Sequence, residues 1–329
     1  MRDMPRILLI KTSSLGDVVH NLPVVGDILD HLPQARIDWV VEESFADIPR
    51  LHPGVSEVIP VAIRRWRGAL SARQTWREIG QLRKTLQVHA YDAVIDTQGL
   101  LKSALIAAFT RGVRHGQDGG SAREPLASLF YARKHAVPRG RHAVVRNRQL
   151  AALALGYVPP HNPPDYGLSG RILAQPQAGS LPAAYVVGLH ATSRSSKLWP
   201  VEHWIVLGRF LGTQGIGLAL PWHSTAERER AMVIASNTPH TTVLPRLALN
   251  GMAAVLGHAR AAVGVDTGLT HLAVALGLPT MALYTDTDPA LTGVLGGTAA
   301  PAINLGNKAS IPSPQQVIEV LEPLLSSAV

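Results

Sequence analysis

The stretch Ala262–His271 reads Ala-Val-Gly-Val-Asp-Thr-Gly-Leu-Thr-His, which predicts a strand, a tight loop and a helix. Small and β-branched residues up to Val265 are typical of a buried strand. The apolar segment Leu269–Leu276 recurs at helical spacing and stops at Gly277. The loop Asp266–Gly268 is therefore expected at a helix N-terminus, where free N–H groups and the helix dipole attract phosphate.

The side chains of this loop suit a bound anion. Thr267 and Gly268 allow ligand oxygens to approach the backbone, since glycine has no Cβ. Asp266 is expected to point into the same crevice, and His271 follows within the first helical turn. A plain turn in which Asp266 or Thr267 caps the helix explains the same pattern, so both interpretations stay open at this point.

Composition restricts the class of protein. The chain has 329 residues, 46% hydrophobic and 16% charged, which predicts a globular fold whose length favours two domains. It has no cysteine, which excludes disulfides and thiolate metal sites and suits a reducing cytoplasm. The first ten residues lack the layout of a signal peptide, and no apolar run is long enough to span a bilayer.

The net charge of +8 is unevenly distributed. Residues 1–170 hold 22 Lys and Arg against 15 Asp and Glu, whereas residues 171–329 hold 9 against 8. The first half is therefore expected to meet an anionic partner, although a solvated basic face is the simpler alternative. The basic segment Arg133–Arg148 could touch anionic lipid head groups. It lacks interleaved aromatic residues, so stacking of single-stranded nucleic acid is not supported, and nucleic-acid binding rests on charge alone.

Strands and helices alternate along the chain, a pattern that predicts an α/β fold with parallel sheets in two similar halves. Predicted strands are Arg6–Ile10, Ile37–Val41, Glu57–Ile63, Tyr91–Asp96, Tyr185–Leu189, Gly217–Leu220, Thr241–Leu244, Ala261–Val265 and Thr280–Tyr284. Helices are predicted from about Asp17, with an interruption at Pro23, and over Thr75–Leu86, Ala122–Phe130, Val201–Leu211, Ala248–His258 and Pro314–Leu325. A proline-rich linker is expected between Gly156 and Pro182.

Two groups of polar residues in the first half follow predicted strands. Ser13, Ser14 and Asp17 come after the first strand, at the edge where α/β sheets bind ligands. Asp17 could also be merely a helix cap. Arg64, Arg65 and Arg67 surround one tryptophan just after another strand, and guanidinium groups suit phosphate or carboxylate recognition. A solvated loop is the alternative there.

In the second half, three predicted strand ends carry residues for a nucleotide diphosphate. The first supplies Thr192, Ser193 and Lys197, the second leads to Glu227, and the third is Asp266–His271. Hydroxyl groups, one lysine and a helix N-terminus can hold a pyrophosphate, and an acidic residue can bind ribose hydroxyls. This set favours group transfer from a nucleotide-linked donor to an anionic acceptor.

Several segments together resemble glycosyltransferase family 9, the heptosyltransferases of GT-B fold. They are Lys11–Asp17, Trp39–Glu43, Ile59–Arg67, Tyr91–Asp96, Ala122–Tyr131, His190–Thr192, Lys197 and Asp266–His271, so the match covers essentially the whole chain. The resemblance implies two Rossmann-like α/β domains that face each other across a central cleft. Residues 1–168 would bind the acceptor and residues 169–329 the nucleotide-sugar donor. Segments 62–67 and 122–128 are similar to the branch that adds the first heptose.

The resemblance also implies a reaction. The donor would be ADP-L-glycero-β-D-manno-heptose and the acceptor the Kdo of Kdo2-lipid A, with inversion at the anomeric carbon. The enzyme would work as a peripheral protein on the cytoplasmic face of the inner membrane, with no metal, no other cofactor and no nucleic-acid partner. The alternatives are a family member that adds a later heptose and a non-catalytic module that binds nucleotide sugar or lipid A.

Residue roles follow by similarity. Asp17 would be the general base, and Lys197 would act in catalysis by holding the donor phosphates. The other implied donor-binding residues are Thr192, Ser193, Glu227, Asp266, Thr267, Gly268 and His271. The implied acceptor-binding residues are Ser14, Arg64, Arg65, Arg67, Gln98 and Arg123. Ser195-Ser196 and Thr285-Asp286 depart from the family pattern near the expected donor site.

Overall fold

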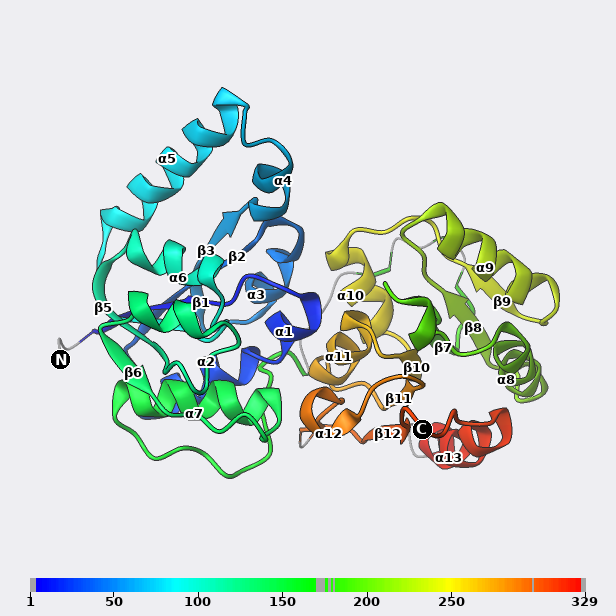
Figure 1. Cartoon of the computed structure of the whole chain (residues 1–329). Coiled ribbons are helices and arrows are strands. Elements are labelled where there is room, and N and C mark those ends of the chain that lie inside the picture. The colour runs from blue at the N-terminus through cyan, green and yellow to red at the C-terminus, as the bar shows by residue number, and fades with distance from the viewer. Residues whose placement is uncertain (1–3, 170–174, 177–178, 180, 298, 327–329) are drawn as a thin grey trace. The chain divides into compact units, whose positions relative to one another are not determined.

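A computed structural model describes residues 4–169, 175–176, 179, 181–297 and 299–326 (Figure 1). The chain divides into two compact units, Met1–Asn162 and Pro163–Val329. The sequence placed the boundary a few residues later, after residue 168. Of the predicted linker between Gly156 and Pro182, residues 170–174, 177, 178 and 180 lie outside the described part of the chain.

The first unit contains a six-stranded parallel sheet in the order β3-β2-β1-β4-β5-β6. The strands are β1 (Arg6–Ile10), β2 (Arg36–Glu42), β3 (Val55–Val61), β4 (Ala90–Asp96), β5 (Arg111–Gln117) and β6 (Arg133–His135). Numbered along the chain, this is the 3-2-1-4-5-6 order of a Rossmann sheet. The direction of winding reverses between β1 and β4, where ligands bind in such folds.

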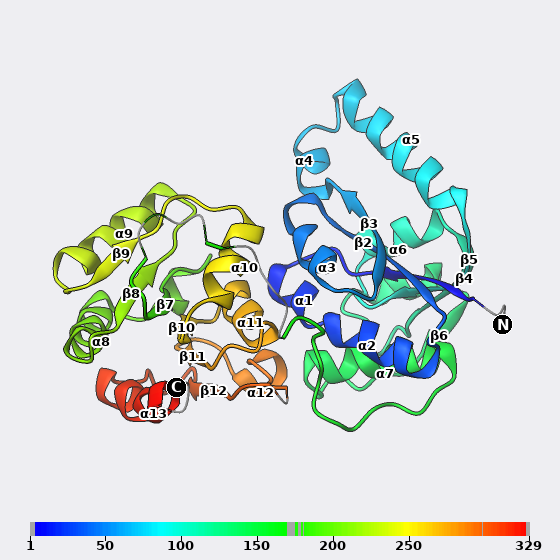
Figure 2. The same cartoon turned by 180° about the vertical axis from the view of Figure 1, so that it is seen from behind.

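Helices cover both faces of this sheet. They are α1 (Leu15–Val19), α2 (Leu22–His31), α3 (Asp47–Leu51), α4 (Ile63–Gly68), α5 (Arg73–Val88), α6 (Leu101–Ala108) and α7 (Ala143–Leu155), with short 3₁₀ helices η1 (Glu43–Phe45) and η2 (Pro125–Phe130). Leu8 and Ile10 of β1 pack with α4, α5 and α6, because alternate side chains of a strand share one face. Helices α2 and α7 lie side by side, as Figure 2 shows from behind.

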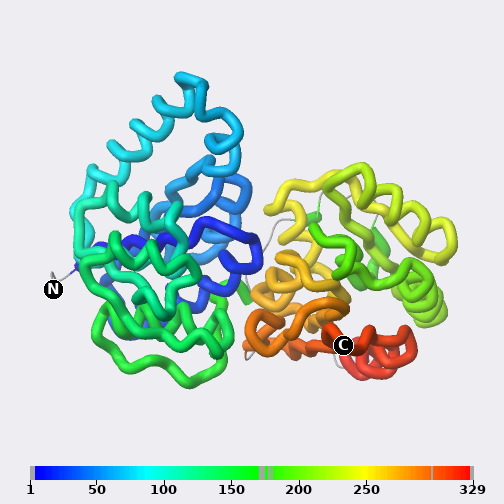
Figure 3. Tube along the Cα trace, viewed as in Figure 1, coloured from blue at the N-terminus to red at the C-terminus, as the bar shows by residue number. Residues whose placement is uncertain are grey.

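The second unit repeats this architecture with the strand order β12-β11-β10-β7-β8-β9. Its parallel strands are β7 (Tyr185–Leu189), β8 (Gly217–Leu220), β9 (Thr241–Val243), β10 (Ala261–Val265), β11 (Thr280–Tyr284) and β12 (Ala302–Gly306). Counted within the unit, the order is again 3-2-1-4-5-6, with the reversal between β7 and β10. The tube in Figure 3 traces the path of the chain by colour from the N-terminus to the C-terminus.

The helices of the second unit are η3 (Ser195–Lys197), α8 (Val201–Thr213), α9 (Thr225–Ser236), α10 (Leu249–Gly257), α11 (Gly268–Ala275), α12 (Pro289–Thr292) and α13 (Pro314–Ser326). Its largest core cluster joins α8, α9 and α13 to one face of the sheet through buried residues such as Trp204, Ile234 and Leu321. Among the described residues, none of the helices combines the length and the apolar character that crossing a membrane requires.

The predicted α/β pattern is confirmed for the buried elements. The predicted bounds of β1, β7, β8, β10 and β11 are those of the structure. The predicted interruption of the first helix is confirmed, because α1 ends at Val19 and α2 begins at Leu22. Pro23 lies in the first turn of α2, where a proline is tolerated.

Other predictions were wrong. The strand predicted over Glu57–Ile63 is Val55–Val61, and Ile63 opens α4, so the three arginines lie on a helix. The helix predicted over Ala122–Phe130 is a 3₁₀ helix that begins only at Pro125. Strands β5, β6 and β12 escaped prediction, because β6 and β12 are edge strands and β5 has a mostly polar sequence.

The basic segment Arg133–Arg148 is not a continuous exposed face. The guanidinium of Arg148 is buried and binds both carboxylate oxygens of Asp27, at 2.7 and 2.8 Å. It also donates to the backbone and side-chain oxygens of Asn162. Arg146 donates to Gln117 and to the backbone of Ser121. The guanidinium groups of Arg146 and Arg148 therefore bind partners inside the first unit rather than lipid head groups.

Replacement of Arg148 by methionine should strongly destabilise the first unit. Asp27 would remain buried without its counter-charge, which typically costs about 3–5 kcal/mol of the free energy of unfolding. Arg50→Met is the matched control, because Arg50 pairs with Asp47 at the surface, and such pairs contribute at most about 1 kcal/mol. Urea unfolding followed by circular dichroism measures both variants. Equal losses of stability would contradict the assigned role of the Arg148–Asp27 pair.

Candidate functional site

The junction between β10 and α11 forms the helix N-terminus that the sequence predicts. Thr267 is the N-cap residue, and its side chain does not bond to the helix, so the first-turn N–H groups lack a side-chain cap. Thr270 Oγ1 instead donates to the carbonyl of Val265 at 2.7 Å. A Cβ on Gly264 would collide with that hydroxyl, so glycine at 264 lets α11 start directly against the strand.

Asp266 joins three loops that follow neighbouring strands. Its Oδ2 lies 2.6 Å from Lys197 Nζ and accepts a hydrogen bond from Thr287 Oγ1 at 2.8 Å. Its backbone carbonyl accepts from Thr192 Oγ1 at 3.1 Å. These contacts connect the loops after β7, β10 and β11 at the carboxyl edge of the sheet, where α/β folds bind ligands.

The Lys197–Asp266 pair positions a cation beside the start of α11. The two side chains are 17% and 14% exposed, so ligand can reach them. An ammonium group has three N–H donors, and Asp266 takes only one of them. The remaining donors and the uncapped N–H groups of α11 give the chemistry of an anion site.

The two departures from the family pattern contact each other. Thr285 Oγ1 donates to the backbone carbonyl of Ser196 at 2.8 Å. This bond fastens the loop that carries Lys197 to the loop after β11. Ser193 lies on the same Lys197 loop and is exposed.

Two histidines lie inside this region. His190, directly after β7, is fully buried, and its burial lowers its pKa to about 4, with the charge of Arg230 acting in the same direction. Its ring is therefore neutral at physiological pH and adds no charge beside the anion site. His271 is also buried, with 6% of its surface exposed.

Glu227 stands in the first turn of α9 and caps it. Its Oε2 accepts from the backbone N–H groups of His223 and Ser224, at 2.7 and 3.3 Å. Its Oε1 makes no hydrogen bond within the described part of the chain, so one oxygen remains for a ligand.

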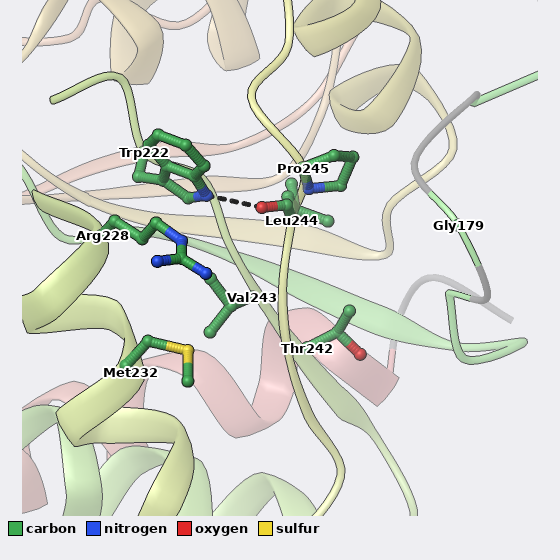
Figure 4. A pocket seen from close by; sticks show the side chains of 8 residues that line it. All are labelled: Gly179, Trp222, Arg228, Met232, Thr242, Val243, Leu244 and Pro245. Atoms are coloured by element: carbon green, nitrogen blue, oxygen red, sulfur yellow. Dashed lines mark hydrogen bonds between the residues drawn. The ribbon is translucent and has the colours of Figure 1, made fainter. Parts of the chain in front are cut away.

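A cavity of about 480 Å³ adjoins this helix (Figure 4). Trp222 and Leu244 follow β8 and β9 and are joined by a hydrogen bond from the indole Nε1 to the Leu244 carbonyl, at 2.6 Å. Arg228 stacks on Trp222, with its guanidinium carbon 5.6 Å from the ring centroid. The remaining lining residues are Gly179, Met232, Thr242, Val243 and Pro245. The wall is mostly apolar, which suits a planar base better than a phosphate.

In the first unit, Asp17 stands in the first turn of α1. Its Oδ2 accepts from the backbone N–H of Ser14 at 2.8 Å and from the Ser14 hydroxyl at 3.2 Å. The carboxylate therefore does cap its helix. Its Oδ1 makes no hydrogen bond within the described residues, so one oxygen can still receive a proton.

Residues of the neighbouring β4 loop hold the segment before Asp17 in place. The amide oxygen of Gln98 accepts from the N–H groups of Thr12 and Ser13, at 3.1 and 3.2 Å. Lys11 is buried and donates to the carbonyl of Thr97 at 2.8 Å and to Asn147 at 3.3 Å. Burial lowers the pKa of Lys11, and the charges of Asp17 and Asp96 oppose that effect.

Lys102 lies beside the candidate site, and the sequence did not single it out. Its Nζ donates to the hydroxyl of Ser13 at 2.7 Å. Burial lowers the pKa of Lys102, and the charges of Arg64 and Arg67 lower it further while that of Asp17 raises it. The signal in the sequence is its place in the first turn of α6, directly after the strand β4 and its loop.

The three arginines of α4 have different environments. Arg65 pairs with Glu43 at 3.2 Å and with Glu78 at 2.8 Å, and these bonds raise its pKa. The same carboxylates line a cavity of about 370 Å³ around Arg65. Arg64 stacks on Phe45, and Arg67 is exposed with no ion-pair partner among the described residues. Arg64 and Arg67 are thus the guanidinium groups left for an anionic ligand.

Arg123 is exposed and belongs to a segment tied to the β4 loop. The N–H of Glu124 donates to the carbonyl of Gly99 at 3.0 Å. Gly99 has a φ of +65°, and a Cβ there would contact Gln117 and the backbone of Arg123. The first unit therefore brings Ser14, Asp17, Gln98, Lys102 and the Arg123 segment to the carboxyl edge of its sheet.

The comparisons with known proteins agree with this architecture. The model of glycosyltransferase family 9 (heptosyltransferase) matches residues 79–320. The chain belongs to glycosyltransferase family 9. Lipopolysaccharide heptosyltransferase 1 of Escherichia coli K12 is 46% identical over 324 residues, which cover 97% of this chain and 100% of that protein. The Pseudomonas aeruginosa protein of the same name is 49% identical over 292 residues, 88% of this chain and 81% of that protein.

Solved structures of family members share the fold. The structure of E. coli heptosyltransferase WaaC with ADP gives a TM-score of 0.89 at 44% identity and covers 97% of this chain and 99% of that one. The same enzyme with ADP-2-deoxy-2-fluoro heptose gives 0.85 with the same identity and coverage. The predicted GT-B fold class is confirmed, and this family 9 chain is a glycosyltransferase.

Replacement of Lys197 by methionine should lower kcat/KM for the donor by about 10²–10³, because fixed donors to a developing oxyanion typically contribute that factor. Lys197→Arg should retain part of the rate, since it keeps the charge but not the compact geometry. Lys308→Met, at an exposed lysine of the same unit, is the control. Steady-state kinetics at varied donor concentration would contradict the assignment if Lys197→Met and the control gave equal rates.

Proposed function

We propose that this glycosyltransferase transfers L-glycero-D-manno-heptose from ADP-heptose to the Kdo of Kdo2-lipid A, with inversion of the anomeric carbon. The observation that carries the proposal is the Lys197–Asp266 pair at the uncapped start of α11. It occurs in a chain similar over its whole length to lipopolysaccharide heptosyltransferase 1. That reaction belongs to the synthesis of the lipopolysaccharide inner core.

In this proposal the donor occupies the second unit. Its diphosphate lies against the N–H groups of Thr267 and Gly268, with Lys197, Thr192 and Ser193 as further donors. The ribose meets the unbonded oxygen of Glu227, and the base fills the cavity beside Trp222. Asp266 and His271 line the sugar end, and Thr287 keeps the Asp266 carboxylate in place.

The acceptor occupies the first unit. Its carboxylates and phosphates meet Arg64, Arg67 and Arg123, while Ser14 and Gln98 contact its sugar. Arg65 contributes mainly through its ion pairs with Glu43 of η1 and Glu78 of α5, which link α4 to both elements.

The chemical step is a direct displacement. The acceptor oxygen forms a bond to the anomeric carbon while the bond from that carbon to the diphosphate oxygen breaks and ADP leaves. The hydroxyl proton passes to Asp17 Oδ1, because the hydroxyl becomes more acidic as its new bond forms. Negative charge grows on the departing diphosphate, where Lys197 and the α11 N–H groups stabilise it.

Asp17→Asn should lower kcat by about 10²–10⁴, the usual contribution of a general base. Asparagine keeps an oxygen for the Ser14 N–H, so the helix cap and donor binding should persist. Asp30→Asn, at an exposed position of α2, is the control. Turnover and ADP-heptose titration by calorimetry separate the two effects. Unchanged turnover in Asp17→Asn would remove the base assignment.

The proposal also predicts that transfer needs no divalent metal, because Lys197 and the helix N-terminus supply the positive charge. Mass spectrometry with Kdo2-lipid A and ADP-heptose should show one added heptose at equal rates with and without EDTA. An acceptor that already carries the first heptose is the control substrate. Transfer to that substrate alone would favour a family member that adds a later heptose, and loss of activity in EDTA would refute the metal-free step.

The acceptor is a glycolipid, so the proposed place of action is a membrane surface. We place the chain as a peripheral protein on the cytoplasmic face of the inner membrane. The excess of basic residues in the first half supports contact with an anionic surface.

A further inference from the structure

Four leucines of the first unit are exposed on two adjacent helices. Leu101 and Leu105 on α6 are 36% and 45% exposed, and Leu126 and Leu129 on η2 are 63% and 71% exposed. Residues four apart on an α-helix share a face, as do residues three apart on a 3₁₀ helix. We name these four side chains the leucine patch. Contiguous exposed apolar groups of this kind mark interaction surfaces.

The two helices that carry these leucines pack against each other. Ala104 of α6 and Ala127 of η2 are buried in one small cluster with Tyr131, and Phe130 packs against it. The carboxylate of Glu124 also accepts from the N–H of Leu101 at 2.7 Å. The small alanines occupy the seam between the helices, so the leucines flank it and face outward.

The chain around the patch is cationic. Arg123, Arg133 and Lys134 are exposed on the segments that enter and leave η2. Glu124 is the single carboxylate in residues 100–109 and 122–134, so the cations outnumber it. Apolar side chains beside cations match an anionic bilayer, since leucines enter the acyl boundary and cations meet lipid phosphates.

The patch adjoins the proposed acceptor site. Lys102 of α6 bonds to Ser13 in the Asp17 loop at 2.7 Å. The residue before η2, Glu124, bonds to Gly99 beside Gln98. A glycolipid that stays in the bilayer would therefore reach these residues with its head group while its lipid remains at the leucines.

We propose that the leucine patch is the surface through which this chain docks on an anionic phospholipid bilayer. The inference rests on the proposed function, because a lipid-linked acceptor gives such a surface its use. The leucine patch, rather than the whole basic segment Arg133–Arg148, is then the surface that contacts the bilayer. Arg146 and Arg148 of that segment form hydrogen bonds inside the unit. The cations beside the leucines complement the charge of an anionic bilayer. A second copy of this chain, with its net charge of +8, would bring like charges together.

Vesicle sedimentation tests the proposal with the full chain. Wild type should bind vesicles of phosphatidylglycerol and phosphatidylcholine, and bind pure phosphatidylcholine more weakly. The double variant Leu126→Ser/Leu129→Ser should partition about tenfold less or weaker still, because two leucines no longer insert. Leu291→Ser/Ile311→Ser, at two exposed apolar residues of the second unit, should bind like wild type. Equal binding of both double variants would overturn the proposal, as would wild type that ignores anionic vesicles.

Heptose transfer to two acceptor forms separates this inference from the proposed function. With a deacylated, water-soluble acceptor the Leu126→Ser/Leu129→Ser enzyme should match wild type, which also shows that it is folded. With the acyl-chain acceptor in vesicles its rate should fall about tenfold, in line with lost partitioning. Equal rates on vesicles would refute the docking surface. No transfer by wild type to either acceptor would refute the proposed function. The vesicle-binding comparison would then still test the leucine patch. Size-exclusion chromatography that shows a wild-type dimer broken by the variant, with vesicle binding unchanged, would assign the patch to a second copy.

Discussion

In each sheet the two central strands are parallel neighbours, so their carboxyl ends lie side by side at one edge. The strand order reverses between them, and α/β folds bind ligands in the crevice that this reversal leaves. In the second unit this constraint brings the loops after β7 and β10 together, and the Lys197–Asp266 pair joins them at 2.6 Å. In the first unit it brings the Asp17 loop beside the β4 loop, where Gln98 binds the backbone of Thr12 and Ser13. The candidate sites follow from strand order before any side chain is considered.

Asp266 shows how one carboxylate organises a site. Its side chain binds the Lys197 ammonium from the loop after β7 and the Thr287 hydroxyl from the loop after β11. Its backbone carbonyl accepts from Thr192, on the same loop as Lys197. The side chains of the Lys197–Asp266 ion pair are 17% and 14% exposed, so a ligand can still reach it. The ion pair holds the Lys197 ammonium in a fixed orientation beside the start of α11, where no side chain caps the N–H groups. Preorganised charge of this kind lowers the barrier without reorganisation during the reaction.

The sequence predicted the buried strands well, because apolar runs such as Ala261–Val265 and Tyr185–Leu189 leave few alternatives. It failed where tertiary packing overrides local pattern. The polar strand β5 is held by neighbouring strands, and Arg148 looks like a surface charge until its partner Asp27, far away in sequence, is known. The positions of Asp17, Lys197 and Asp266 in loops after strands could be predicted, because each follows an apolar strand pattern. Lys102 and Thr287 were missed because their partners come from other elements.

The most direct measurement is the structure of this chain with ADP bound. The account predicts the diphosphate at the start of α11, with oxygens within hydrogen-bonding distance of Lys197 Nζ and the N–H of Gly268. It also predicts that the bonds from Thr192 and Thr287 to Asp266 persist. ADP bound away from α11, with the first-turn N–H groups still open to water, would contradict the central claim that this helix start and its lysine hold the leaving group.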